Sequence, residues 1–418
     1  MKILHITPSY KPAYIYGGPI QSVGKLCEEM SRLASTSSDK NGNLKSLGDE
    51  EKLNINVLTT TANGIVELDV KTGQPFMVNG VRVTYFKRWT KDHSHFSTGL
   101  LSYLRNDILG FDHNDRLIIH IHAWWNLVSV LSCFIAKWYR VPVVLSPRGM
   151  LTTYSQNNRN SFSKKLLHNI IGKRLLQYCH IHATSEQEKD DIQKIISPKS
   201  IAVIPNLVNL EDNEEGIKYQ GEGYLVPIIK YQQESSGNEK LLNLIFLSRI
   251  EEKKGLELLF GALAQLEINW QITIAGSGNN EYVKHLKDKA KSLNLNSRIT
   301  WIGQVNNEEK YKLMAKHDLL VLTSYNENFA NVVVESLSVG TPVLISDQVG
   351  ISDYVIKNEL GWICELNPEG IKDELVKAFS QQEKRDHIRL NAPALITHDF
   401  DDTVLANKYL KLYQQLLR

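Results

Sequence analysis

The stretch that decides the fold is Ser324-Tyr-Asn-Glu-Asn-Phe-Ala-Asn-Val-Val-Val-Glu-Ser-Leu-Ser-Val-Gly-Thr-Pro-Val343. It follows the apolar run Leu319–Thr323, which is typical of a buried strand. The pattern predicts a short helix that ends at Gly340 and Pro342, and a second buried strand begins at Val343. A strand, a turn and a helix in this order predict a parallel α/β sheet with a ligand site where the first strand ends.

Two carboxylates, Glu327 and Glu335, are expected at the edge and in the middle of this helix. Eight residues of helix rise by about 12 Å, so the two side chains can bind separated sets of hydroxyls. The backbone N–H groups of Phe329, Ala330 and Asn331 are expected at the helix N-terminus, where they suit a phosphate. The sequence therefore predicts a ligand with phosphate in its middle and hydroxyls at both ends.

Length and composition indicate a two-domain globular protein. A chain of 418 residues is longer than a single hydrophobic core usually supports. Its 42% hydrophobic and 22% charged residues are ordinary for a soluble protein. The net charge of +2, without any basic motif, predicts no nucleic-acid partner. Four scattered cysteines without a CxxC pair argue against a disulfide framework or a zinc site and fit the cytoplasm. We expect neither a signal peptide nor a membrane span, because no apolar run approaches about 20 residues.

Short apolar runs alternate with amphipathic stretches in both halves of the chain, which is typical of βαβ units and parallel sheets. We predict an N-terminal Rossmann-like domain at 1–209, a linker at 210–239, a C-terminal Rossmann-like domain at 240–398 and a final helix within 399–418. That helix is amphipathic and must bury its apolar face against one of the domains. The polar stretch 34–52 is predicted to be an insertion.

Two cations and two glycines follow predicted strands. Arg249 and Lys254 lie in the loop after the first strand of the second half, where they could hold a diphosphate. The alternative is a solvated basic loop, and we assign Lys253 to that class. Gly17 and Gly18 follow the first strand and would let a ligand approach the backbone, although a plain turn explains them equally well.

Strands of the first half end near further polar side chains. His122, Trp124 and Arg148 are candidate substrate contacts, whereas His120 fits a packed core histidine. No HExxH, Asp-x-Asp, EF-hand or P-loop pattern is present, and Gly276-Ser-Gly278 matches only part of a dinucleotide fingerprint. We therefore expect no metal and no cofactor. The basic amphipathic stretch 159–177 is predicted to pack on the sheet, and contact with anionic lipid headgroups is the alternative.

In these motifs the chain resembles the retaining glycosyltransferases of the GT-B fold, specifically the family 4 type, which includes bacterial polysaccharide and lipid-linked sugar transferases. The most specific element is the E-x7-E pattern from Glu327 to Glu335, followed by Gly340-Thr-Pro-Val343. The resemblance implies two Rossmann-like domains facing across a cleft, with the final helix crossing back to the first domain. It implies a hexosyltransferase that moves a sugar from a nucleotide donor, favourably a UDP-sugar, to a glycan or lipid-linked acceptor in surface polysaccharide synthesis.

Residue roles also follow from the resemblance. Glu327 would bind the donor sugar, Glu335 the ribose, and Arg249 and Lys254 the leaving diphosphate. The backbone of Phe329, Ala330 and Asn331 would hold phosphate and sugar, and the loop at Val305 the base. Gly17 and Gly18 would approach the phosphates, while His122 and Trp124 would lie on the acceptor side.

One departure concerns Arg148-Gly149, which replaces a common His-Gly pair that is thought to touch the donor sugar. We expect this change to alter sugar choice, with a uronic acid as one candidate. The rival functions are a GT-B epimerase or phosphorylase, and a non-catalytic sugar-nucleotide-binding protein. The expected location is the cytoplasm, with attachment to the inner membrane face as an alternative.

Overall fold

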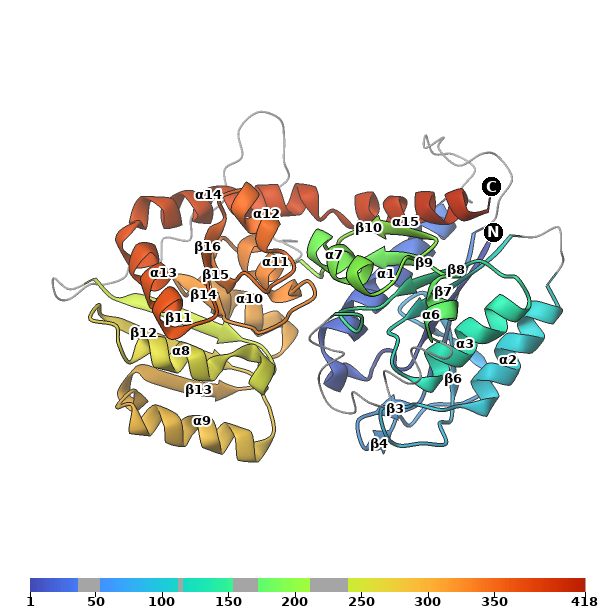
Figure 1. Cartoon of the computed structure of the whole chain (residues 1–418), viewed down its shortest axis with the longest axis horizontal. Coiled ribbons are helices and arrows are strands. Elements are labelled where there is room, and N and C mark those ends of the chain that lie inside the picture. The colour runs from blue at the N-terminus through green and yellow to red at the C-terminus, as the bar shows by residue number, and fades with distance from the viewer. Residues whose placement is uncertain (37–52, 112–115, 153–171, 211–239, 418) are drawn as a thin grey trace. The chain divides into compact units, whose positions relative to one another are not determined.

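The computed structural model describes residues 1–36, 53–111, 116–152, 172–210 and 240–417. Most of the predicted linker and insertion, and most of the basic stretch 159–177, lie outside these ranges. The chain forms two compact units, Met1–Val208 with Asp401–Arg418, and Asn209–Phe400. We call them unit 1 and unit 2 (Figure 1). Within the described ranges, each helix is too short or too polar to span a bilayer.

Unit 1 is built on an eight-stranded sheet with the order β10-β9-β8-β7-β1-β2-β6-β5. The strands are β1 (Lys2–Thr7), β2 (Asn54–Thr60), β5 (Pro75–Val78), β6 (Val81–Phe86), β7 (Leu117–His122), β8 (Val143–Ser146), β9 (His180–Ala183) and β10 (Ser200–Val203). All neighbours pair in parallel except β5 and β6, which are antiparallel. The parallel sheet is therefore as predicted, with one antiparallel edge strand that the sequence pattern did not reveal. A two-stranded hairpin, β3 (Ala62–Asn63) and β4 (Val66–Glu67), follows β2.

Helices cover both faces of this sheet. The bounds are η1 (Tyr14–Tyr16), α1 (Gly18–Thr36), α2 (Thr98–Leu109), α3 (Leu127–Trp138), α6 (Lys173–Leu176) and α7 (Glu186–Ile195). Helix α2 packs on α3 and α3 on α6, and together with the sheet they enclose a core that includes Leu104, Ile119 and Cys133. All six residues of β7 are buried, including His120 and His122, as expected for a central strand of a sheet that is covered on both faces.

Helix α15 (Asp402–Leu416) belongs to unit 1 although it ends the chain. It packs against α1, where Lys25 pairs with Asp402 over 2.7 Å and Thr403 Oγ1 donates to Glu29 Oε1 over 3.1 Å. Its buried face carries Tyr409 and Tyr413, both of which are at most 1% exposed. The apolar face of the predicted final helix is therefore buried against the first unit.

Unit 2 has a six-stranded parallel sheet with the order β13-β12-β11-β14-β15-β16. The strands are β11 (Leu242–Leu247), β12 (Trp270–Ala275), β13 (Ile299–Gly303), β14 (Leu319–Leu322), β15 (Val343–Ser346) and β16 (Gly361–Cys364). The helices are η3 (Glu252–Lys254), α8 (Leu256–Leu263), α9 (Asn280–Ser292), η4 (Asn296–Arg298), α10 (Asn307–Ala315), α11 (Asn331–Ser338), α12 (Ser352–Lys357), α13 (Pro368–Ser380) and α14 (Gln382–Asp399). Helix α8 packs with α9 and α13, while α11 packs with α10 and α14.

Candidate functional site

The strand order of unit 2 creates a switch point between β11 and β14. The chain runs outward from β11 to β12 and β13, then returns to β14 and continues in the opposite direction. The connections that leave β11 and β14 therefore diverge at the carboxyl edge, where parallel sheets of this kind bind ligands. The loops that follow these two strands carry Lys254 and Glu327, two of the residues that the sequence singled out.

Lys254 and Glu327 form an ion pair in which Lys254 Nζ donates to Glu327 Oε2. Their side chains are 6% and 19% exposed. Burial opposes ionisation of Glu327, yet the charges of Lys254, Lys253 and Arg249 outweigh it and hold its pKa below the ordinary value. Burial also lowers the pKa of Lys254, while the charge of Glu327 opposes that shift. The structure thus holds an ionised carboxylate and its counter-charge at the switch point.

Gly255 brings the two loops together. Its φ is +68°, and a Cβ atom there would lie 1.9 Å from the carbonyl oxygen of Thr323. Thr323 Oγ1 in turn donates to Gly255 O over 3.1 Å. Only glycine allows this approach, so the residue next to Lys254 fixes the distance between the loops after β11 and β14.

The helix that carries the second carboxylate starts later than predicted. Helix α11 begins at Asn331, and Ala330 before it has a left-handed φ of +67°. Glu327 therefore precedes the helix, so the helical rise of about 12 Å does not describe its separation from Glu335. Glu327 is held instead by its backbone, because its N–H donates to Gln348 O (3.1 Å) and its carbonyl accepts from Gly350 N (2.7 Å).

Glu335 lies in α11 and forms a second buried ion pair that the sequence did not indicate. Lys310 of α10 donates to Glu335 Oε1 over 2.8 Å, and the two side chains are 7% and 6% exposed. The carboxylate thus has one oxygen bound by a cation, while no hydrogen bond to its Oε2 is present among the described residues. In the sequence Lys310 stands among charged residues and looks exposed. Its burial beside Glu335 becomes evident only from the packing of α10 on α11.

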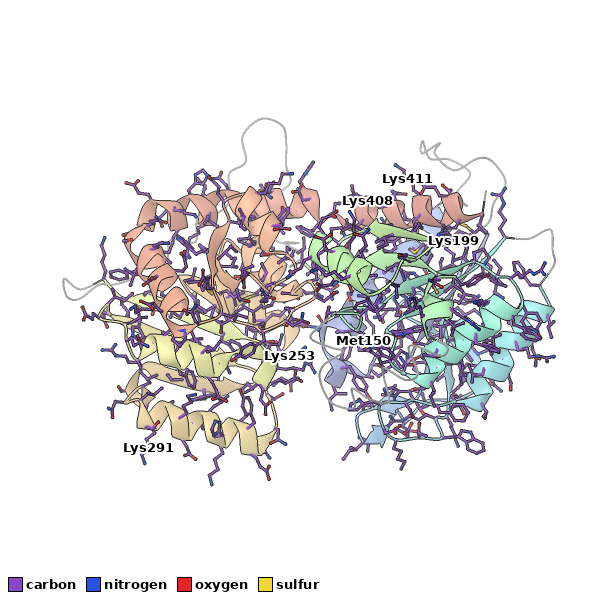
Figure 2. All side chains as sticks on the ribbon, in the orientation of Figure 1. Met150, Lys199, Lys253, Lys291, Lys408 and Lys411 are labelled. Carbon is purple, nitrogen blue, oxygen red and sulfur yellow. The ribbon has the colours of Figure 1, made fainter. Side chains whose placement is uncertain are left out.

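The remaining unit 2 candidates lie on neighbouring loops at the same edge of the sheet. Arg249 pairs with Glu251 over 2.7 Å and is 45% exposed. Val305 is half-buried and follows Gly303 at the end of β13. Lys253, labelled in Figure 2, lies in η3 directly before the buried Lys254. The structure therefore pairs Lys254 with Glu327, holds Glu335 in a separate buried pair with Lys310, and leaves Arg249 at the surface.

The candidate site residues of unit 1 differ in backbone conformation and in burial. Gly17 has a left-handed φ of +70°, and Gly18 begins α1. His122 is 1% exposed, and its Nε2 lies 3.0 Å from His5 Nδ1. Trp124 is fully buried in the core of unit 1. A side chain without any exposed surface has no means of touching an acceptor in this conformation, so we leave Trp124 out of the proposed site.

Four buried histidines on neighbouring parts of the sheet form a cluster: His5 on β1, His120 and His122 on β7, and His182 on β9. His120 hydrogen-bonds to Tyr413 OH (2.6 Å) and Ser146 Oγ (2.7 Å), and His182 to Ser146 Oγ (2.6 Å). Burial lowers the pKa of His5 and His182 to about 3 and that of His120 and His122 well below the ordinary value. The ring nitrogens of His5, His120 and His122 lie within 4.8 Å of one another, as metal ligands can. Because both nitrogens of His120 are already bonded to hydroxyls, these neutral rings form a hydrogen-bond network.

Two family models match separate parts of the chain. The model described as glycosyltransferase family 4 matches residues 50–212, and that described as glycosyl transferases group 1 matches residues 228–394. The second range contains Lys254, Glu327 and Glu335. The two carboxylates and the buried lysine therefore lie within the part that resembles group 1 glycosyl transferases.

Individual proteins are similar over most of the chain. An uncharacterised glycosyltransferase of Methanocaldococcus jannaschii is 24% identical over 81% of this chain and 85% of its own. A Campylobacter jejuni N-acetylgalactosaminyltransferase that acts on a diphospho-undecaprenol-linked sugar is 25% identical over 62% and 65%. The solved structure of HepE from Anabaena in complex with UDP-glucose superposes with a TM-score of 0.66, at 19% identity over 99% of this chain and 100% of HepE. The likeness to HepE identifies the fold of two parallel-sheet units as GT-B and confirms the predicted fold class.

Proposed function

Because the chain belongs to the GT-B glycosyltransferases of the family 4 type, we propose that it transfers a sugar from a UDP-sugar to a glycan or lipid-linked acceptor with retention of anomeric configuration. The observation that carries this proposal is the buried Lys254–Glu327 pair at the switch point of unit 2. A cation fixed beside a carboxylate there can neutralise a departing diphosphate while the carboxylate binds sugar hydroxyls.

The contacts of the other unit 2 residues support the roles that we propose for them. Glu335 has one oxygen held by Lys310, which supports its role as an acceptor for the ribose hydroxyls through the other oxygen. Arg249, at the surface of the same edge, adds a second cation for the diphosphate. We propose that these cations, rather than a metal ion, stabilise the leaving group. The roles expected for Gly17, Gly18 and His122, and for the backbone of Phe329, Ala330, Asn331 and Val305, stay predictions.

The acceptor and setting are proposals as well. The Campylobacter relative acts on a lipid-diphosphate-linked sugar, which supports a similar acceptor class for this chain. We place the reaction in the cytoplasm, in surface polysaccharide synthesis, with contact to an anionic membrane as an alternative to a fully soluble enzyme.

The test measures UDP release from UDP-sugars by wild type, Lys254→Ala and Glu327→Ala, with and without a pool of lipid-linked acceptors. Both variants should lose turnover while their circular dichroism spectra stay as in wild type. Lys291→Ala is the control, since this exposed lysine of α9 forms no ion pair among the described residues, and it should keep turnover. Full turnover in both Lys254→Ala and Glu327→Ala would contradict the proposal, and sugar conversion without any acceptor would favour an epimerase.

A separate binding measurement tests the nucleotide. A UDP-sugar present at 100 times its Kd should raise the free energy of unfolding by about 2.7 kcal/mol. Stabilisation by GDP- or ADP-sugars but not by UDP-sugars would show that the base has been wrongly assigned.

A further inference from the structure

Phe400 is the last residue of unit 2, and its ring packs on the loop that leads into α11. The ring centroids of Phe400 and Phe329 lie 6.1 Å apart in an edge-to-face arrangement, with an interplanar angle of 64°. Phe400 is 2% exposed and Phe329 4% exposed. Phe329 stands between Glu327 and Ala330 in the chain. A residue at the end of unit 2 therefore contacts the loop that carries the carboxylate proposed to bind the sugar.

The ring of Phe400 also contacts α12. The ring of Tyr354 meets it edge-to-face at a centroid distance of 5.2 Å and an interplanar angle of 78°. Tyr354 OH donates to Asp399 Oδ2 over 2.8 Å, which joins α12 to the end of α14 (Figure 1). Helix α12 begins directly after the segment 348–350 that hydrogen-bonds to the backbone of Glu327. Phe400 therefore packs between the loop before α11 and the helix that follows the backbone partners of that loop.

The loop needs such support because Ala330 has a left-handed backbone, with a φ of +67°. An alanine in this conformation is strained, since its Cβ atom crowds the following carbonyl oxygen. Strain of this kind persists where the surroundings enforce it, commonly at functional sites. The residue before Ala330 is Phe329, whose side chain is buried against Phe400. The contact between the two rings therefore opposes relaxation of the loop at Ala330.

We propose that Phe400 is a positioning residue for donor binding: by fixing Phe329, it keeps the loop from Glu327 to Ala330 in the conformation that binds the nucleotide sugar. The proposal rests on the glycosyl transfer proposed above. Phe400 acts through Phe329 and not by touching a substrate, since its own side chain is buried. Without its ring, only a fraction of the molecules would hold the loop ready, and the apparent affinity for the donor would fall by that fraction.

The first measurement needs no nucleotide and follows amide hydrogen exchange of the segments 324–333 and 347–352 by mass spectrometry in wild type, Phe400→Leu and Phe260→Leu. Phe260 is the matched control, because this fully buried ring of unit 2 meets Trp301 edge-to-face at 6.2 Å. Phe400→Leu should speed exchange in both segments about two- to tenfold, the factor expected from the loss of one edge-to-face aromatic pair. Phe260→Leu should leave their exchange unchanged.

The second measurement is steady-state UDP release from UDP-glucose, UDP-galactose and UDP-N-acetylglucosamine by the same three proteins. For the sugar that wild type turns over, Phe400→Leu should raise KM about two- to tenfold and leave kcat nearly unchanged, because saturating donor restores the loop. A general loss of folded protein would instead lower kcat at an unchanged KM.

A rescue variant tests the role of the strained alanine. Glycine adopts the left-handed conformation without steric cost, so Ala330→Gly in the Phe400→Leu background should recover part of the lost donor affinity. Tyr354→Phe provides a milder second variant should Phe400→Leu fail to fold. It keeps the ring and removes only the bond to Asp399, and it should speed exchange of the same two segments.

Two results would overturn the proposal: exchange of the two segments that is unchanged in Phe400→Leu or equally faster in Phe260→Leu, or a loss of kcat in Phe400→Leu without a rise in KM. Faster exchange in Phe400→Leu alone, together with no turnover of any UDP-sugar by wild type, would instead contradict the proposed function and leave Phe400 as the residue that holds this loop.

Discussion

Lys310 and Glu335 form a 2.8 Å ion pair across α10 and α11, with side chains only 7% and 6% exposed. Two charges buried this deeply stabilise the protein only while they are together, because each alone would be desolvated without compensation. The pair therefore fixes the carboxylate to which we assign the ribose.

Replacing Lys310 by Met should lower the free energy of unfolding by about 3–5 kcal/mol, since Glu335 would be left buried and unpaired. Urea denaturation followed by circular dichroism measures the loss. The double variant Lys310→Met/Glu335→Met should recover much of it. Lys377→Met is the control, because its pair with Glu374 leaves Lys377 57% exposed, so its replacement should leave the free energy of unfolding nearly unchanged. Equal losses in the two single variants would refute the argument.

Gly255→Ala should separate the loops after β11 and β14. Gly73, whose φ is +75° and whose missing Cβ would meet no atom within 4 Å, provides a control in which only backbone strain acts. That strain costs about 1–2 kcal/mol, and Gly255→Ala adds a clash with Thr323 O that should cost about 1–3 kcal/mol more. UDP release should fall in Gly255→Ala and stay unchanged in Gly73→Ala. If both variants lost the same stability, the close approach at Gly255 would not matter.

The buried histidines predict a loss of stability in mild acid. Their pKa values are lowered by burial, to about 3 for His5 and His182, so between pH 3 and 6.5 the unfolded chain binds protons that the folded chain does not. Stability from each neutral ring is therefore present above pH 6.5 and falls by about 1.4 kcal/mol per pH unit below it.

Urea denaturation of wild type and His5→Asn between pH 6.5 and 5 tests this dependence. His5 is the simplest ring to replace, since among the described residues its Nε2 has no hydrogen-bond partner and its Nδ1 hydrogen-bonds to His122. The variant should take up about one proton fewer on unfolding in this range, so its free energy of unfolding should depend less steeply on pH than that of wild type. Identical slopes would show that His5 titrates alike in the folded and unfolded chain.

Tyr413→Phe should remove the hydroxyl that bonds His120 Nδ1 over 2.6 Å. A buried ring nitrogen left without its partner costs about 1–3 kcal/mol. Tyr139→Phe is the matched control, because the bond from Arg105 Nε to Tyr139 OH (3.1 Å) is exposed and its loss should change stability by about 0.5 kcal/mol or less. A larger effect at Tyr139 than at Tyr413 would contradict the importance of the network.

The sequence predicted the parallel sheets well because their strands are apolar on both faces. The predicted run Leu319–Thr323 contains β14, and the strand predicted to begin at Val343 is β15. Strand β5 was not predicted, because Pro75–Val78 is a short, half-exposed edge segment without a continuous apolar run. Proximity of Lys254 and Glu327 also followed from sequence, since both come after strands whose carboxyl ends share one edge.

The sequence could not predict side-chain partners whose contacts depend on packing between elements that are distant along the chain. Lys310 lies in a polar stretch, and only the contact of α10 with α11 buries it against Glu335. Trp124 looked available after its strand, yet it is fully buried in the core of unit 1. The partners of Arg148 come from α1, from β7 and from the segment after β10, a combination that no local pattern encodes.

Helix α15 has a consequence for how the protein is made. Tyr413 hydrogen-bonds to His120 of β7, and Tyr409 to His182 of β9. The buried histidines of the first unit therefore lack these partners until α15 emerges from the ribosome. The second unit is translated in the meantime and can fold first. A nascent chain stalled before residue 402 should therefore display a protease-sensitive amino-terminal half beside a resistant second unit, an inversion of the usual vectorial order of domain folding.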